Sequence, residues 1–279
     1  MDTTFDPRNI KTNFDRDGYA SLPGFFSPEQ LTELRHHLDR FVRMCLPSMP
    51  GDQVFYGVKD RPDTLTRMVQ MYEYDSFFKS LISESRIEKL AETLLDGPVI
   101  IHNMQFFNKP AGTGGPTPAH QDGYYFRIHP VEALTFWIAL EDVDEDTGCV
   151  RYVRGSHQEG IRPHVKSGVI GFSQFMRDYP RPEDLTNEVS LPVRAGDMLV
   201  HHALTIHRAD GNASPLRSRQ AVGIVYFSQR ARHDAEAARA YKQQLAEERA
   251  EGARRSGDRE TPPRQPGVDP DRLTNRPQQ

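Results

Sequence analysis

The segment PTPAHQDGYYF, residues 116–126, places a histidine and an aspartate one residue apart, at His120 and Asp122. If this aromatic-rich run is a β-strand, both side chains point to the same face and can converge on one metal ion. The pattern recurs at His37 and Asp39, but inside a segment of helical periodicity, where positions i and i+2 point about 200° apart. We therefore interpret the second pair as helix-surface residues and the first as half of a candidate metal site.

A third metal ligand is expected in the late segment AGDMLVHHALTIHRADGN. His207 lies on a predicted strand there, and an Asn-x-Ser sequence and arginines follow it; His201 and His202 are the alternatives. Two histidines and one carboxylate leave coordination positions open, as in the facial triad of non-haem Fe(II) oxygenases. A structural zinc site would need four ligands, mostly Cys and His, at a spacing that this chain lacks.

The elements that must position these residues fall into two groups. Ser27 as N-cap, Pro28 in the first turn and Gln30 as the third helical residue predict the start of one helix. A second helix is predicted over about residues 75–95. Over residues 98–229, at least seven short runs rich in β-branched and aromatic residues are separated by Gly, Pro, Asp and Asn. These features predict the α+β class, with a jelly-roll-like (cupin-like) core behind N-terminal helices.

The chain is expected to form one domain over residues 1–229, followed by a charged, Ala-rich helix over residues 230–251. The tail over residues 252–279 is poor in hydrophobic residues and rich in proline and charge. Such a composition cannot bury enough apolar surface to fold, so we expect the tail to be disordered.

Charge and composition argue against several classes of partner. A net charge of −4 gives no field that attracts nucleic acid or an anionic membrane, and no run of 18 apolar residues predicts a membrane span. Cys45 and Cys149 suit reduced thiols, and the polar N-terminus lacks the apolar segment of a signal peptide. We therefore expect a cytoplasmic protein whose partner is a small molecule; the sequence does not predict whether it forms an oligomer.

Five segments occur in the order of a known family: FFNKP, HQDGYYF, WIALEDVDEDTGCVRYVRGSH, AGDMLVHH and IHRADGNASPLRSRQAV. Through them the chain resembles the phytanoyl-CoA dioxygenase family of Fe(II)- and 2-oxoglutarate-dependent oxygenases, from about residue 13 to residue 229. The resemblance implies a double-stranded β-helix (a jelly roll) that uses Fe(II), 2-oxoglutarate and O2, with His120, Asp122 and His207 as the iron ligands. It favours His207 over His202 because the Asn-x-Ser sequence and an arginine follow His207 at the family's distance.

The resemblance also implies residues that bind 2-oxoglutarate. The family's arginine, whose two parallel N–H groups match a carboxylate, usually follows the distal histidine by eleven residues, where this chain has Ser218. Arg219 is preferred because RQAV matches the start of the family's next strand, and Arg217 is the alternative. Three further residues match cosubstrate contacts of the family: Gln105, Trp137 and Arg67. Core packing would explain Trp137 equally well.

The reaction implied is oxidation of a C–H bond, typically hydroxylation, with release of succinate and carbon dioxide. Asp122 favours this reaction over halogenation, for which related enzymes replace the carboxylate with Gly or Ala. Two alternatives stay open: a cupin-like metalloenzyme that does not use 2-oxoglutarate, and a non-catalytic jelly-roll binding protein. The fold does not fix a substrate. Candidate pocket-lining residues are Tyr124, Tyr125, Phe126, Arg127, Arg151 and His157.

Overall fold

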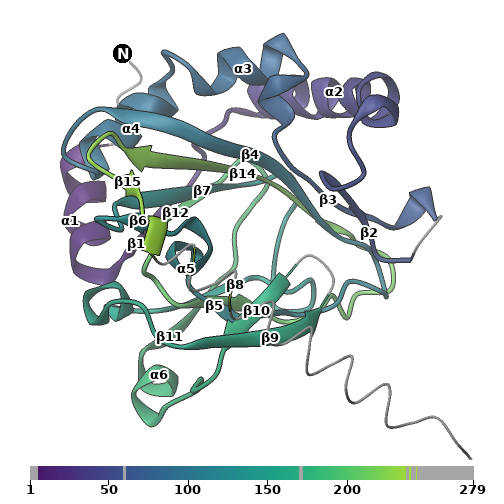
Figure 1. Ribbon diagram of the computed structural model, residues 1–279. Coiled ribbons are helices and arrows are strands. Elements are labelled where there is room, and N and C mark those ends of the chain that lie inside the picture. The colour runs from purple at the N-terminus through teal and green to yellow at the C-terminus, as the bar shows by residue number, and fades with distance from the viewer. Residues whose placement is uncertain (1–5, 59–60, 170–171, 237–238, 240–242, 244–279) are drawn as a thin grey trace, which may run out of the picture. The chain divides into compact units, whose positions relative to one another are not determined.

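A computed structural model describes residues 6–58, 61–169, 172–236, 239 and 243 (Figure 1). Contacts divide the chain into two units, Met1–His233 and Asp234–Gln279, and the elements below lie in the first. The helix expected over residues 230–251 does not begin as predicted, because Arg232 and His233 form a strand. Most of that segment after residue 236, and the whole tail over residues 252–279, lie outside the described residues.

Seven antiparallel strands form the larger sheet, in the order β1-β12-β7-β14-β4-β3-β2. They are β1 (Tyr19–Leu22), β2 (Val54–Tyr56), β3 (Leu65–Met68), β4 (Val99–Lys109), β7 (Ala133–Ala139), β12 (Met198–His202) and β14 (Arg219–Ser228). The interior strand β7 is buried on both faces. Phe136 and Ile138 belong to the core beneath the helices, whereas Trp137 and Ala139 belong to a second core on the opposite face.

Four antiparallel strands form the smaller sheet, in the order β11-β8-β13-β5. They are β5 (Thr117–His120), β8 (Val150–Val153), β11 (Glu188–Leu191) and β13 (His207–Ala209). The sheets pack face to face, since the second core joins Trp137 and Leu199 of the larger sheet to Val150 and Tyr152 of the smaller one. Two further strand pairs are β9 (His164–Val169) with β10 (Phe172–Met176), and β6 (Ile128–His129) with β15 (Arg232–His233).

Helices cover the other face of the larger sheet (Figure 1). They are α1 (Pro7–Asp17), α2 (Pro28–Met44), α3 (Ser76–Ile82) and α4 (Arg86–Leu94), and shorter helical turns are η1 (Leu46–Ser48), η2 (Pro62–Thr64), η3 (Met71–Glu73), α5 (Asp122–Phe126), η4 (Ser156–Glu159) and α6 (Pro182–Asn187). None of the described helices combines the length and the apolar character that crossing a bilayer requires. Helices beside antiparallel sheets confirm the predicted α+β class.

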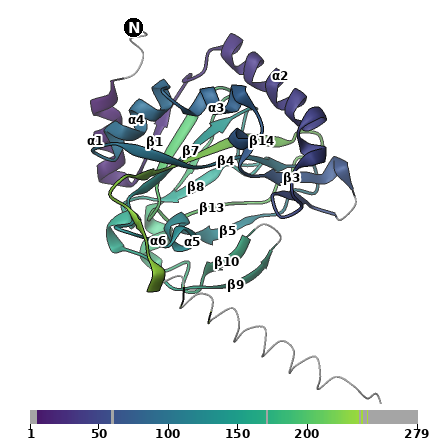
Figure 2. The same ribbon diagram turned by 45° about the horizontal axis from the view of Figure 1, so that its top comes forward.

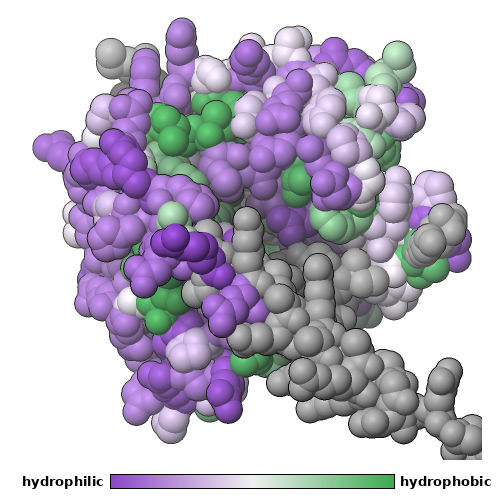
Figure 3. All heavy atoms as spheres, in the orientation of Figure 1, coloured by the Kyte–Doolittle hydropathy of each residue, from purple (hydrophilic) through white to green (hydrophobic). Residues whose placement is uncertain are grey.

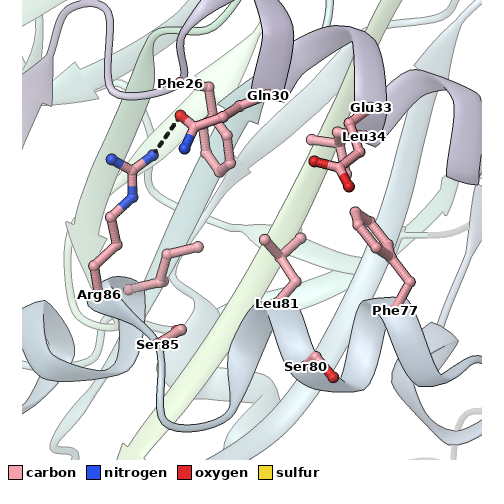
Figure 4. A pocket seen from close by; sticks show the side chains of 10 residues that line it. Phe26, Gln30, Glu33, Leu34, Phe77, Ser80, Leu81, Ser85 and Arg86 are labelled. Atoms are coloured by element: carbon pink, nitrogen blue, oxygen red, sulfur yellow. Dashed lines mark hydrogen bonds between the residues drawn. The ribbon is translucent and has the colours of Figure 1, made fainter.

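The predicted helix starts meet with different outcomes. The start of α2 is confirmed: Ser27 and Gln30 form a reciprocal capping box. The single helix expected over residues 75–95 is wrong, because Glu84 adopts a left-handed conformation (φ 52°) and separates α3 from α4. Arg86 at the start of α4 donates to Gln30 Oε1 at 3.0 Å and so links α4 to α2 (Figure 4).

Hydrophobic side chains on the face shown in Figure 3 form small patches separated by hydrophilic ones. The large hydrophobic residues that are exposed in the described part of the chain are Met44, Val58, Ile100, Ile161, Leu185 and Leu216. Hydrophobic residues that are exposed singly are ordinary in folded proteins.

Candidate metal centre

His120, Asp122 and His207 come together between the two sheets. One ligand atom of each lies within 4.8 Å of the other two, and no second such group of three occurs among the residues that the structure describes. Oδ1 of Asp122 is 3.6 Å from His120 Nε2 and 3.8 Å from His207 Nε2. Strands β5 and β13 are neighbours (Figure 2). The two histidines face each other because His120 is paired opposite His207 in this register. These separations suit three ligands around one ion, whose bonds are about 2 Å long.

The expected strand ends at His120, two residues before Asp122, which begins helix α5 instead. The prediction was wrong because the aromatic residues favour a strand, whereas the N–H of Gly123 donates to Ala203 O at 2.8 Å and turns the chain. Gln121 keeps an extended backbone (φ −121°, ψ 126°). One extended residue between His120 and Asp122 is enough to put both side chains on the same side.

Replacing Gly123 with valine is expected to lower the free energy of unfolding by about 1–3 kcal/mol, the usual cost of overpacking. A Cβ atom at this position would lie 2.6 Å from Val131 Cγ1 and 3.2 Å from Ala203 O. Urea denaturation measures the change. Gly51→Ala is the control, since a Cβ there meets nothing within 4 Å; equal stability of the two variants would contradict the tight packing at Gly123.

Both ligand histidines are held in one tautomer. Nδ1 of His120 lies 2.8 Å from Pro118 O, and Nδ1 of His207 lies 3.0 Å from Thr205 O. A carbonyl can only accept, so each Nδ1 carries the proton and each Nε2 presents a lone pair to the site. Burial, and then the neighbouring His120, lower the pKa of His207 well below its usual value. His207 is therefore neutral, as a metal ligand must be.

The carboxylate of Asp122 has two different oxygens. Oδ2 accepts hydrogen bonds from Thr135 Oγ1 at 2.6 Å and from His201 Nε2 at 3.2 Å, whereas Oδ1 faces the two ligand histidines. Burial by itself would raise the pKa of Asp122, but the neighbouring imidazoles of His120 and His201 outweigh burial and hold the pKa well below its usual value. The side chain is therefore ionised and ready to bind a cation.

The two alternative distal ligands take other positions. His202 Nδ1 accepts the N–H of Leu204 at 3.1 Å, and its ring lies against Phe14. His201 reaches the site but bonds to Asp122. Two imidazole nitrogens and one carboxylate oxygen, gathered on one side of a cavity, fit an Fe(II) ion with open coordination positions.

A cavity of about 590 Å³ opens beside the three ligands and is lined by strands of both sheets. The expected cosubstrate residues Arg67, Gln105, Trp137 and Arg219 all line it. Gly223 lies opposite Gln105 and Trp137 in the sheet, and a Cβ at Gly223 would lie 2.8 Å from Phe107 and 3.2 Å from Gln105. Glycine at this position keeps the space beside Trp137 open.

Arg219 and Arg217 lie in opposite environments. Arg219 is 4% exposed, its Nε atom is buried without a hydrogen-bond partner, and its guanidinium lies 5.4 Å from the centre of the Trp137 ring. Burial lowers the pKa of Arg219 to about 10, so it remains a cation at neutral pH. Arg217 is exposed and pairs with both oxygens of Asp144 at 2.8 and 3.1 Å. Of the two candidates, only Arg219 offers a charge to the cavity.

The chain matches the model of the phytanoyl-CoA dioxygenase family over residues 14–221. This match covers well over half of the sequence and all of the expected site residues. The chain belongs to the phytanoyl-CoA dioxygenase family. Among curated members, it is 32% identical to phytanoyl-CoA dioxygenase domain-containing protein 1 of Mus musculus, over 78% of this chain and 88% of that one. It is 33% identical to phytanoyl-CoA dioxygenase 1 of Oryza sativa, over 55% of this chain but only 54% of that one.

Solved structures of similar fold include proteins described as α-ketoglutarate-dependent or solved with 2-oxoglutarate or Fe. The α-ketoglutarate-dependent carbocyclase SnoK of nogalamycin biosynthesis is 25% identical, with a TM-score of 0.64 over 84% of this chain and 90% of that one. EvdO2 from Micromonospora carbonacea, complexed with 2-oxoglutarate, is 25% identical, with a TM-score of 0.65 over 84% of this chain and 94% of that one. EctD from S. alaskensis with bound Fe is 19% identical, with a TM-score of 0.66 over 81% and 78%, and shows likeness of fold alone.

Arg67 and Gln105 contact each other. Both were matched by sequence to cosubstrate contacts of the phytanoyl-CoA dioxygenase family. Nε and one terminal nitrogen of Arg67 donate to Gln105 Oε1 at 3.1 and 2.7 Å. The guanidinium lies between the rings of Phe55 and Phe107, at 5.8 and 5.5 Å from their centres. Burial lowers the pKa of Arg67. The pair forms a polar wall of the cavity between two aromatic side chains.

Of the six candidate pocket residues, two line the cavity and four lie elsewhere. Tyr125 and Phe126 line the cavity, but Tyr124 stacks on His164 with ring centres 4.2 Å apart. Arg151 lies in ion pairs with acidic residues of the smaller sheet, and His157 bonds to the backbone of Asp15. Arg127 is the left-handed cap of α5. Four of the six are therefore structural rather than cavity-lining.

Sequence reasoning missed the part played by Gln121, which joins the segments that carry the ligands. Its buried side chain donates to Gly160 O at 2.8 Å and Leu204 O at 2.7 Å and accepts the N–H of Arg162 at 2.8 Å. Its own N–H donates to His164 Nε2 at 3.1 Å. The sequence did offer a signal. Gln121 stands between two expected metal ligands, in a segment that has to be buried, and a buried amide side chain needs hydrogen-bond partners.

Sequence reasoning also missed Lys109, whose buried amine donates to Gly115 O at 2.6 Å and Asp210 O at 2.8 Å. Lys109 lies opposite Arg219 in the β4–β14 register and lines the same cavity. Burial, and then the charge of Arg219, lower the pKa of Lys109 to about 6. The signal available in the sequence was a lysine at the end of a predicted strand, next to the aromatic residues of FFNKP.

The shift at Lys109 predicts a pH dependence of stability. The pKa of Lys109 is about 6 in the folded protein but about 10.4 in an unfolded chain. The unfolded chain therefore binds more protons between these values, and stability rises with pH across that window. We expect wild type to gain about 1 kcal/mol per pH unit relative to Lys109→Met between pH 7 and 9. Urea denaturation at several pH values measures this, and parallel curves would contradict it.

Proposed function

We propose that this protein is a non-haem Fe(II)- and 2-oxoglutarate-dependent dioxygenase. It oxidises a C–H bond of a small molecule, typically by hydroxylation, and releases succinate and carbon dioxide. The observation that carries the proposal is that a buried arginine without an ion-pair partner among the described residues, Arg219, lines the same cavity as the three-ligand cluster. An unpaired buried cation requires an anion, and a dicarboxylate that also reaches the metal meets that requirement.

Each residue has a stated part in this proposal. His120, Asp122 and His207 hold Fe(II), and Arg219 binds the remote carboxylate of 2-oxoglutarate. Trp137 supports the guanidinium of Arg219, while Gln105 and Arg67 form the polar wall beside the cosubstrate. When bound, iron, 2-oxoglutarate and oxygen supply the oxidising chemistry; the protein orients the target C–H bond and excludes bulk water.

The fold and its surroundings are part of the same proposal. The two facing antiparallel sheets support assignment as a double-stranded β-helix within a domain of residues 1–229. Relatives named as α-ketoglutarate-dependent, including SnoK, support the cosubstrate. The free thiols of Cys45 and Cys149 support a cytoplasmic location. A cupin-like enzyme that ignores 2-oxoglutarate would have no use for Arg219.

Anaerobic visible spectroscopy tests the proposal. Adding 2-oxoglutarate to Fe(II)-loaded protein should produce a weak charge-transfer band that neither component gives alone. Under air, succinate release across a metabolite library should then identify the substrate. A folded, metal-loaded protein that gives no band with 2-oxoglutarate would contradict the proposal and favour the cosubstrate-free alternative.

A further inference from the structure

The second oxygen of the metal-binding carboxylate is already occupied by protein donors. Thr135 on β7 and His201 on β12 are paired opposite each other on neighbouring strands of the larger sheet. Both reach Oδ2 of Asp122, at 2.6 and 3.2 Å. Both are buried, at 4% and 3% exposure, so water does not compete for these bonds.

The protonation pattern of His201 follows from its other neighbour. Nδ1 of His201 lies 2.9 Å from the hydroxyl of Tyr152. Tyr152 is fully buried and stacks on Tyr19 with ring centres 4.8 Å apart. Because Nε2 faces a carboxylate oxygen, Nε2 must carry a proton and donate it, and Nδ1 accepts from Tyr152. A protonated Nε2 cannot bind a metal, so His201 is not a fourth ligand.

We propose that His201 is a positioning residue that, together with Thr135, confines Asp122 to binding the metal through Oδ1 alone. This inference rests on the proposed metal site. The chain Tyr152–His201–Asp122 runs through one edge of the site, and Oδ1 stays turned toward His120 and His207.

The hydrogen bonds to Oδ2 matter because they set how many coordination positions of the ion stay open. A carboxylate binds a cation through one oxygen or through both. With one oxygen, three protein atoms occupy three of six octahedral positions, and the other three can take a bidentate keto acid and oxygen. With both oxygens, only two positions remain. A keto acid could then bind only in the orientation that those two positions allow, whether or not its remote carboxylate meets Arg219, and no position would be left for oxygen.

The test uses the full chain loaded with Mn(II), which reports binding without turnover. Free Mn(II) is followed by electron paramagnetic resonance, and 2-oxoglutarate binding to the loaded protein is followed by calorimetry. In His201→Leu we expect the Kd for 2-oxoglutarate to rise at least about tenfold, the lower end of what an outer partner costs in affinity or activity. The Kd for Mn(II) should change by less than about threefold, because the freed second oxygen of Asp122 can bind the ion as well. His201→Gln, whose amide N–H can reach Oδ2, should bring the Kd for 2-oxoglutarate back to within about threefold of wild type.

Other outcomes overturn the role of His201. Equal losses of Mn(II) and 2-oxoglutarate affinity without rescue by glutamine would mean a merely structural residue, and an unchanged Kd for 2-oxoglutarate would mean no role. If His201→Leu does not fold, Thr135→Val removes the other donor at nearly constant shape, and the same criteria apply to it. Wild-type protein that does not bind Mn(II) would contradict the proposed function itself, whereas wild-type binding with unaffected variants overturns only this inference.

Discussion

Replacing Asp122 with alanine is expected to weaken Fe(II) binding by at least about 100-fold and to abolish 2-oxoglutarate-dependent succinate release. Removing even an outer partner of a metal ligand typically costs 10–100-fold in metal affinity or activity, and Asp122 is itself a ligand and the only carboxylate in the cluster. Its oxygen faces both imidazole nitrogens at 3.6 and 3.8 Å. Without it, two neutral imidazoles remain and no negative charge balances the cation. Anaerobic titration with Fe(II) measures the change.

The matched control for this loss is Asp39→Ala. Asp39 belongs to the other His-x-Asp sequence, but it is exposed on helix α2. Its removal should leave Fe(II) affinity and succinate release at wild-type levels. Metal binding that survives in Asp122→Ala, or is lost in Asp39→Ala, would place the ion elsewhere in the molecule.

Replacing Arg219 with alanine is expected to raise the Kd for 2-oxoglutarate by at least about 30-fold while Fe(II) affinity stays near wild type. Truncating one partner of a buried charge pair costs about 2 kcal/mol or more, and 1.4 kcal/mol corresponds to a factor of ten. Arg219 is 4% exposed and lines the cavity beside Trp137, so its removal leaves the remote carboxylate in a buried position without its charged partner. Calorimetric titration of the metal-loaded protein with 2-oxoglutarate measures the change.

Arg217→Ala provides the comparison for Arg219. Arg217 was the sequence-based alternative, but it lies at the surface and its fork is already paired with Asp144. Exposed pairs of this kind contribute little, so 2-oxoglutarate affinity should not change. A large effect of Arg217→Ala with none of Arg219→Ala would reverse the assignment, and no effect of either would favour a metalloenzyme without a keto-acid cosubstrate.

The sequence predicted the ligand set better than the local structure around it. Types and spacing pointed to His120 and Asp122, and the family resemblance favoured His207 as the distal histidine; the structure brings these three together. The strand expected through Asp122 is instead helix α5. Its start depends on the hydrogen bond from Gly123 to Ala203, a partner 80 positions away that local pattern cannot reveal. Helix α1 was missed as well, although Asp6 caps it and Pro7 opens it.

Residues that hold the ligands in place could not be found from the chain alone. Thr135, Tyr152 and His201 lie on three different strands and meet only through strand order and register. Thr135 stands within the otherwise apolar run LTFWIA, where β7 turns it to the same side as Trp137. The sequence shows that this threonine is an exception in an apolar strand. It does not show which residue the threonine contacts, because that depends on which strands become neighbours.

An anaerobic crystal structure of the protein with Fe(II) and 2-oxoglutarate tests the central claim most directly. We expect one ion about 2 Å from His120 Nε2, Asp122 Oδ1 and His207 Nε2, with the keto acid on the ion and its remote carboxylate on Arg219. An ion bound elsewhere, Asp122 turned away from both imidazoles, or a keto acid that does not reach Arg219 would contradict the account.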